Sequence, residues 1–578
     1  MEGDKVQRIP FPEGGPPSPL LCTEYPNPYW LYLTAFCFWS GISLFRWLVL
    51  FLCDDGGTII MYWNMVDCVL MLSQALWVFW HLMVSHHRWR YVDAEPYGDV
   101  SPEDITHVLT ILHATEPAQQ LYNLVSDLKA LACDGKKVLM IGMEAVTPEI
   151  EEKMATIKKD HGDAFEKILY TVHKLRRGEI VGTGSNHFET QVGAEIYFAN
   201  MEPEVKSNVI FSKFDTNMKL DKDGMLLREI ESVWCMVDPE TRKCITFMPN
   251  LYWSADVQDR LRNYMEMFVS FSMSTLLQQA SFSMAFVSGS LEGVTEIGYT
   301  PPALLAEDDL TFTKKQVLLR KPRTYRLCSA ILKVFVTGKD IGKRRWTLDF
   351  LDKKMKRWML GHVEKDIYMT QWLCCRRCCL RNFDAKHPPI RNKLRAVGCL
   401  LTSLLRMYLI FALPLNVVPC VFFYLPGVWK EEEYDFKWLT ILEILPDVTP
   451  YMKLRVPYGV VNVLPETRTT AIILFLGFWF LAIGAGLSLG IMMRIQVRIY
   501  RSFKFLKFNW RTLALYGLVF MPVLLLMGPL FLLWSFLKHG CRNRPAGHVM
   551  LVGAGAGHSD TDASTDDDGD EEEVETLL

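Results

Sequence analysis

The sequence predicts an α/β domain inserted between two groups of transmembrane helices. Long apolar runs occur toward both ends of the 578-residue chain, and about 300 residues of ordinary soluble composition separate them. In that central part, short β-branched runs alternate with helical segments, which favours a largely parallel sheet covered by helices on both faces. With 22% charged residues, the chain can hold one large soluble domain beside its membrane segments.

The chain is expected to begin with a tether and a membrane anchor. Residues 1–27 contain six prolines and are predicted to be a disordered tether. Residues 28–85 hold two apolar runs, Trp30–Leu52 and Ile59–Val84. Each run is long enough to cross a hydrocarbon layer of about 30 Å.

Two opposite charges lie inside these predicted spans. A short loop makes the two helices antiparallel neighbours, and a rise of about 1.5 Å per residue puts Arg46 and Asp67 at nearly the same depth. Because an unpaired charge at that depth is costly, we predict that the two residues form a salt bridge.

The central domain is expected over residues 100–375. Its predicted strands are nearly continuous apolar runs, as in parallel strands that are buried on both faces. A basic, aromatic stretch near 340–375 indicates interfacial helices. The predicted strands are 108–112, 137–141, 168–173 and 208–214, and the predicted helices are Gln119–Leu131 and Thr147–His161.

Five polar residues lie where the predicted strands end: Thr115, Glu116, Glu144, Asp215 and Asn217. Ligands of such sheets bind beyond the carboxyl ends of the strands. Asp215 at a strand end offers hard oxygen ligands to a divalent metal that bridges a diphosphate. An Asp/Asn turn with a capping role is the simpler alternative.

Acidic residues also gather at Glu307, Asp308 and Asp309, at the start of an apolar run. Such a cluster commonly marks a helix N-terminus, where the helix dipole favours negative charge. It can equally supply a general base for a sugar hydroxyl.

Two further motifs are ambiguous by themselves. Gly182-Thr183-Gly184-Ser185-Asn186 lacks the lysine and the spacing of a P-loop and resembles a flexible turn. Arg357 and Trp358 belong to a basic amphipathic stretch, where an interfacial helix with snorkelling side chains is the simpler interpretation. The same two side chains could instead neutralise a leaving diphosphate and stack on a sugar ring.

In their order and spacing, these elements resemble the membrane-integrated family 2 glycosyltransferases, akin to cellulose, chitin and hyaluronan synthases. The resemblance is closer to little-characterised family 2 membrane proteins, and it covers roughly residues 105–375. The motifs that carry it are Thr171-Val172-His173, Gly178-Glu179-Ile180, Gly182-Thr183-Gly184-Ser185-Asn186, and Arg357-Trp358 followed by Gly361 and Glu364.

The resemblance implies a GT-A (Rossmann-like) domain that transfers a sugar from a nucleotide-diphospho-sugar, usually UDP-linked, with inversion. It implies Mg²⁺ or Mn²⁺ as cofactor and a glycan or lipid as acceptor. Thr115, Glu116, Glu144 and Asn186 would bind the donor, and Asp215 with Asn217 would hold the metal. Asp308, next to Glu307, would deprotonate the acceptor, while Arg357 and Trp358 would contact the diphosphate and the acceptor.

Three positions depart from the family pattern. Asn217 stands where a second Asp is usual, Glu144 replaces an Asp, and Lys354 replaces the Gln of a Gln-x-x-Arg-Trp motif. The first departure weakens the expected metal site, and the last weakens the expectation of processive synthesis. A catalytically degraded member of the fold is therefore one alternative.

Residues 397–537 are predicted to form about three further spans, and residues 545–578 a disordered acidic tail. Basic segments beside the spans predict a multi-pass membrane protein whose catalytic domain is cytosolic. They do not distinguish the plasma membrane from the Golgi. A net charge of −3 gives no reason to expect a nucleic-acid partner. A transport protein with a cytosolic regulatory domain is the alternative from another class.

Overall fold

The computed structural model describes most of the central domain and little of the predicted membrane part. The described residues are 5–17, 37, 41–42, 44–46, 48–49, 63, 66, 98–114, 116–176, 179, 182–220, 224–255, 286–302, 304, 307–320, 322–335, 394–395, 397–401, 437–440 and 455–458. Among them, no helix is both long and apolar enough to cross a membrane. The predicted spans lie almost entirely outside these residues, as do the interfacial helices and the acidic tail, so those boundaries stay predictions.

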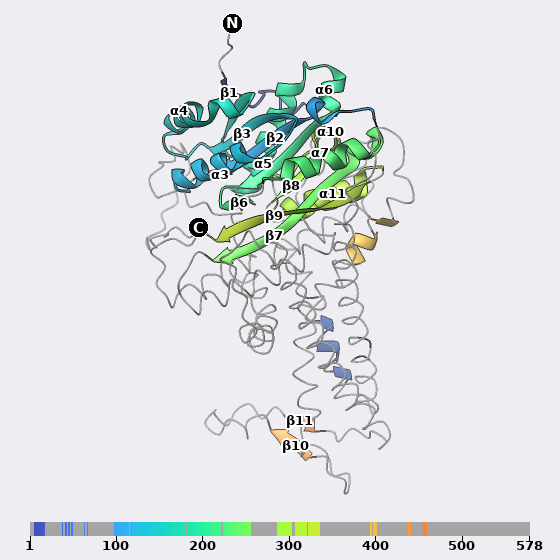
Figure 1. Ribbon diagram of the computed structural model, residues 1–578. Helices are drawn as coiled ribbons and strands as arrows, with labels where there is room; N and C mark the ends of the chain where they lie inside the picture. Colours follow the sequence, from blue (N-terminus) through green and yellow to red (C-terminus); the bar gives the residue numbers. More distant parts are fainter. Residues whose placement is uncertain are drawn as a thin grey trace, which may run out of the picture.

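A mixed sheet of nine described strands forms the centre of the domain, in the order β1-β4-β3-β2-β5-β8-β7-β9-β6 (Figure 1). β1 to β5 run parallel to one another, and β8 is antiparallel to both β5 and β7. The strands are β1 (Val6–Arg8), β2 (Thr106–His113), β3 (Lys136–Glu144), β4 (Lys167–His173), β5 (Val209–Asp215), β6 (Met218–Leu220), β7 (Ile245–Ala255), β8 (Val287–Ser290) and β9 (Arg323–Phe335).

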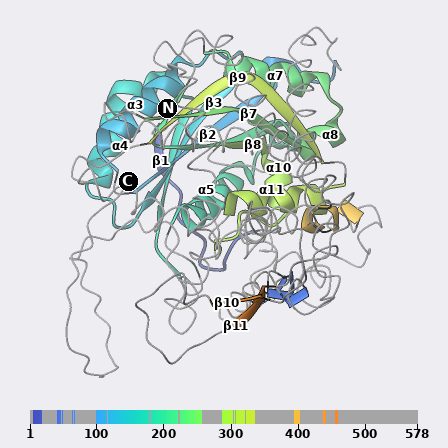
Figure 2. The same ribbon diagram turned by 90° about the horizontal axis from the view of Figure 1, so that it is seen from below.

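Helices cover both faces of this sheet (Figure 2). One face carries α3 (Ala118–Ala130), α4 (Ile150–His161) and α7 (Leu226–Met236). The other carries α5 (Thr183–Phe198), α10 (Leu291–Glu296) and α11 (Glu307–Leu318). The remaining described elements are α6 (Pro203–Ser207), α8 (Pro239–Cys244), two short 3₁₀ helices (Pro102–Asp104 and Gly162–Ala164) and a separate pair of strands, β10 (Lys437–Thr440) and β11 (Arg455–Tyr458).

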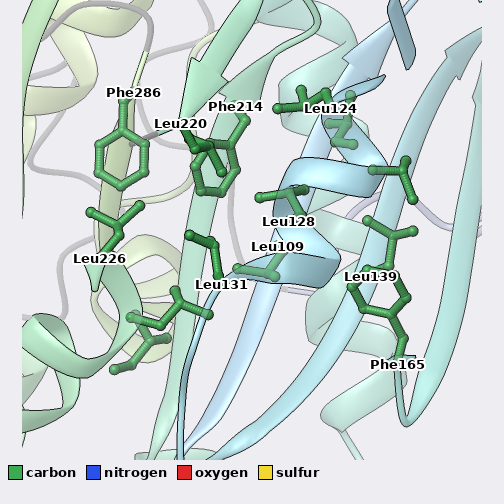
Figure 3. Packing of buried hydrophobic residues seen from close by; sticks show 14 of the residues in the cluster. Leu109, Leu124, Leu128, Leu131, Leu139, Phe165, Phe214, Leu220, Leu226 and Phe286 are labelled. Carbon is green, nitrogen blue, oxygen red and sulfur yellow. The ribbon is translucent and has the colours of Figure 1, made fainter. Parts of the chain in front are cut away.

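The hydrophobic core follows from the alternation of side chains along the buried strands. Leu109 and Leu139 belong to a cluster that also contains Leu128 of α3 and Leu226 of α7 (Figure 3). Their neighbours Val108 and Val138 point the other way and pack with residues of α5. Both faces of the strands are therefore apolar, which explains the continuous apolar runs in the sequence.

The structure corrects two predictions about local structure. The N-terminal segment is not wholly irregular, because Val6–Arg8 form β1 and pair in parallel with β4. The glycine-rich motif is not a flexible turn, because Thr183–Asn186 form the first turn of α5. The four predicted strands and the two helices predicted between them all occur, with ends shifted by at most three residues.

Arg46 contacts the second predicted span. Its guanidinium lies 4.6 Å from the centre of the Trp63 ring, and the side chain is buried. The two predicted spans are therefore neighbours at this point, as the short loop between them suggests. Asp67 lies outside the described residues, so its pairing with Arg46 stays a prediction.

Candidate functional site

The order of the strands places a switch point between β2 and β5. From β2 the chain moves outward through β3 and β4, and it then returns to lay β5 on the other side of β2. Their carboxyl ends are level, since Leu112 pairs with Asp215. A crevice outside this switch point is the ordinary ligand site of such sheets.

Glu116 and Asp215 flank this switch point. Glu116 follows β2 and accepts a hydrogen bond of 2.7 Å from the backbone N–H of Ala114. Burial raises the pKa of Glu116, and the nearby negative charge of Asp215 acts in the same direction. The structure therefore brings these two predicted site residues together, while Thr115 lies outside the described residues.

Glu144 is the last residue of β3, where it contacts a buried histidine of β4. His173 donates from Nδ1 to Glu144 Oε2 at 2.7 Å and from Nε2 to Glu179 Oε2 at 3.0 Å. Burial by itself lowers the pKa of His173, but the two carboxylates outweigh it and raise that pKa to about 9. Glu144 thus takes part in an ion pair that links two strand ends to the segment before α5.

The start of α5 approaches the end of β3 from the other side. Gly182 precedes the helix with a φ of 150°, a conformation that favours glycine. Asn186 is fully buried and donates from Nδ2 to the carbonyl of Gly142 at 3.0 Å. The N-terminus of α5, the positive end of the helix dipole, is therefore fixed beside the strand ends.

The start of α11 completes the arrangement. Glu307 accepts a hydrogen bond of 2.5 Å from the hydroxyl of Thr183 and so ties α11 to α5. Asp308 accepts one of 2.7 Å from the ammonium of Lys213, which also lies 3.8 Å from Asp215. Acids predicted from separate parts of the sequence, Asp215 and Asp308, therefore share one buried cation.

Three buried acceptors around this arrangement have no hydrogen-bond donor in the described part of the chain. They are Glu144 Oε1, Asn186 Oδ1 and Asn217 Oδ1. Buried polar atoms are normally paired, so such atoms need an explanation. They lie at the ends of β3 and β5 and at the start of α5, around the acids described above.

No family model matches the sequence, and no curated protein matches it. Among solved structures, a mannosyltransferase of Pyrobaculum calidifontis in complex with GDP-Man and Mn²⁺ is similar, with 14% identity and a TM-score of 0.37. That match covers 82% of this chain and 99% of the other. Residues 1–349 of S. aureus TarS in complex with UDP match with 10% identity and a TM-score of 0.25, over 52% of this chain and 80% of that one. Matches with such low identities and TM-scores do not establish a function. The function is therefore argued from the chemistry of the site.

The residues present do not fit the predicted divalent metal on Asp215 and Asn217. Mg²⁺ and Mn²⁺ bind through several hard oxygen ligands, mainly carboxylates. Here the Lys213 cation already lies beside Asp215, and Asn217 contributes only a neutral amide. Within the described residues, no three His, Cys, Asp or Glu side chains lie close enough to share an ion.

Sequence reasoning missed the contacts made by His173 and Lys213. His173 belongs to the motif Thr171-Val172-His173, and nothing local to it shows its two carboxylate partners. Lys213 did carry a signal, because it is a charge inside an apolar strand and lies two residues before Asp215, on the same face. Arg357 and Trp358 lie outside the described residues, so their roles stay predictions.

Proposed function

We propose that this chain is a membrane-bound inverting glycosyltransferase that uses a nucleotide-diphospho-sugar, UDP-linked as the resemblance implies. The observation that carries the proposal is the convergence of Glu116, Asp215 and Asp308 at the switch point of an α/β sheet. Unpaired acceptors beside them suit the hydroxyl and N–H donors of a nucleoside and a sugar.

Donor binding is assigned to the ends of β2 and β3 and the start of α5. We assign to Glu116, Glu144 and Asn186, and to Thr115 by its position in the sequence, the hydrogen bonds to the base and the ribose. The N-terminus of α5 favours the negative diphosphate through its backbone N–H groups. Glu307 holds the two helix starts together through Thr183.

The chemical step is assigned to Asp308. The acceptor hydroxyl oxygen attacks the anomeric carbon of the donor sugar, and the bond from that carbon to the diphosphate breaks. The hydroxyl proton passes to the Asp308 carboxylate, and the nucleoside diphosphate leaves with the bonding electrons. Attack opposite the leaving group inverts the anomeric centre. Positioning and electrostatic stabilisation supply most of the rate.

The remaining parts of the proposal rest on the sequence. Arg357 and Trp358 contact the diphosphate and the acceptor, and the predicted spans place the domain on the cytosolic side of the plasma membrane or Golgi. The acceptor is a glycan or a lipid that meets the site at the membrane surface.

Asp308→Asn tests the assignment of the base. Loss of a general base costs about a hundredfold to ten-thousandfold in rate, so UDP release from UDP-sugars by the purified full chain should fall in that range. The amide oxygen can still accept from Lys213, so UDP affinity should change little. Asp160→Asn, the same change at an exposed position of α4, is the matched control. Near-normal turnover of the Asp308 variant would remove Asp308 from the mechanism.

One observation favours a second candidate, a donor-binding protein without transferase activity. The proposed base is held in an ion pair at 2.7 Å, which competes with its approach to an acceptor proton. This candidate predicts that the wild-type chain binds UDP but releases none from UDP-sugars. The same assay therefore separates the two functions.

A further inference from the structure

Lys213 is a cation enclosed within the proposed site. It is 1% exposed and lies on β5, on the face that α5 and α11 cover. Its Nζ atom is 2.7 Å from Asp308 Oδ1 and 3.8 Å from Asp215 Oδ1. The ammonium therefore joins two acids that come from a strand end and from a helix start.

This lysine stays charged because of its neighbours. Its ammonium donates a hydrogen bond to Asp308 and lies beside Asp215, so two carboxylates offset its charge inside the protein. A buried ammonium with such partners is a positive charge built into the site.

The charge of Lys213 bears on whether the site needs a divalent metal ion from solution. In a diphosphate site a divalent metal usually holds carboxylates in a set arrangement and offsets the negative charge of the ligand. Lys213 already holds Asp215 and Asp308 in a set arrangement. Its positive charge also reduces the formal charge of this acid pair from −2 to −1. Among the residues that the structure describes, the donor set left for a metal is poor, since Asn217 is neutral and Asp215 lies beside the ammonium.

We propose that Lys213 is a positioning residue that takes the structural and charge-balancing place of a divalent metal. In consequence, the site binds its nucleoside-diphosphate ligand without Mg²⁺ or Mn²⁺. This inference rests on the proposed function for its ligand, a nucleotide-diphospho-sugar, but the position of the cation is independent of that function. Lys213 acts through Asp308 and Asp215 rather than by touching the substrate.

UDP affinity of the full-length wild-type chain, measured by calorimetry in EDTA and in Mn²⁺, is the first test. The two affinities should agree within about threefold, which is well under 1.4 kcal/mol. A loss of about tenfold or more in EDTA would overturn the proposal.

Lys213→Ser and Lys213→Arg form the second test. Removing the ammonium leaves two neighbouring carboxylates without their cation, so the Ser variant should lose about tenfold in UDP affinity in EDTA and regain it in Mn²⁺. The Arg variant keeps a positive charge and should stay independent of metal. The control is Lys243→Ser, which removes the lysine of an ion pair with Glu296 outside the site. A Ser variant that weakens without Mn²⁺ rescue would show a purely structural role and overturn the proposal.

Melting temperature without nucleotide separates this inference from the proposed function. Mn²⁺ should raise the melting temperature of the Lys213→Ser variant and leave that of the wild type unchanged. If no form binds UDP, the proposed function fails, and this measurement still decides the role of Lys213. If the Ser variant does not fold, the wild-type and Lys213→Arg titrations decide it.

Discussion

His173 shows how strongly a single buried residue can depend on its partners. Its imidazole is 1% exposed and lies between Glu144 of β3 and Glu179 of the segment before α5. Arg176 joins the same cluster by donating to Glu179 at 2.9 Å and by pairing with Glu189. An uncharged ring in this place would leave the carboxylates with less compensation, so the charge on His173 stabilises the fold.

His173→Gln should therefore change the pH dependence of stability. The pKa rises from 6.5 to about 9 on folding, so the stabilisation is complete below pH 6.5 and is lost as pH rises through about 9. The shift corresponds to at most about 3 kcal/mol. Melting temperature measured across this window should fall for the wild type and change less for the variant. His161→Gln, a change at the end of α4, should keep the wild-type slope; equal slopes for all three chains would contradict the prediction.

At the scale of elements, the close contact of β3 with α5 fixes the site. A side chain at Gly142 would place its Cβ 2.4 Å from Asn186 Oδ1 and 2.6 Å from Thr190 Cγ2. Only glycine allows the helix to approach the strand this closely. The same approach lets Asn186 bond to the backbone of Gly142.

Gly142→Ala should push the start of α5 away from the sheet. We expect a loss of about 1–3 kcal/mol in stability, the usual cost of overpacking, together with weaker UDP binding. Gly162→Ala is the matched control, because its Cβ would meet nothing closer than Lys158 Cγ at 3.9 Å. Melting temperature and UDP titration of both variants check this. Equal melting temperatures and UDP affinities of the two variants would show that α5 can shift away from β3 at little cost in free energy.

The elements differ in how well the sequence predicts them. The apolar runs of β2 to β5 are visible locally, and so are the acids that follow them, because the strands are buried on both faces. The start of α5 was not predictable in this way. Gly182-Thr183-Gly184-Ser185-Asn186 has the composition of a turn, and its helical state depends on tertiary contacts such as Asn186 with Gly142. The pair of Lys213 with Asp308 joins residues 95 apart, beyond any local pattern.

At the scale of the whole molecule, the N-terminal segment belongs to the domain. β1 lies at an edge of the sheet, Ile9 is 4% exposed, and Phe11 packs on Phe188 of α5. The guanidinium of Arg176 lies 3.5 Å from the centre of the Phe11 ring. A proline-rich sequence gave no sign of this, since three residues become a strand only where β4 offers a partner.

Ile9→Ala should destabilise the domain, although Ile9 lies far in sequence from the site acids Asp215 and Asp308. Truncation of a buried isoleucine costs about 2–5 kcal/mol, so the melting temperature of the purified full chain should fall clearly. Val205→Ala removes apolar atoms from a more exposed position, at 37% exposure, and should have a small effect. An Ile9 variant as stable as the control would show that β1 is bound only weakly.

The pairing of β1 with β4 also constrains how the polypeptide is threaded through a bilayer. β1 and the strands β2 to β9 belong to one sheet, so they lie in the same aqueous compartment. A chain that leaves a compartment and returns to it crosses the bilayer an even number of times. The number of membrane crossings predicted within residues 18–97 must therefore be even, and a prediction of a single signal-anchor helix would not fit this sheet. Two crossings agree with the apolar runs Trp30–Leu52 and Ile59–Val84. If residues 18–97 hold the two predicted spans, both ends of that segment lie on one side of the bilayer, one joined to β1 at the edge of the sheet and the other leading to β2 inside it.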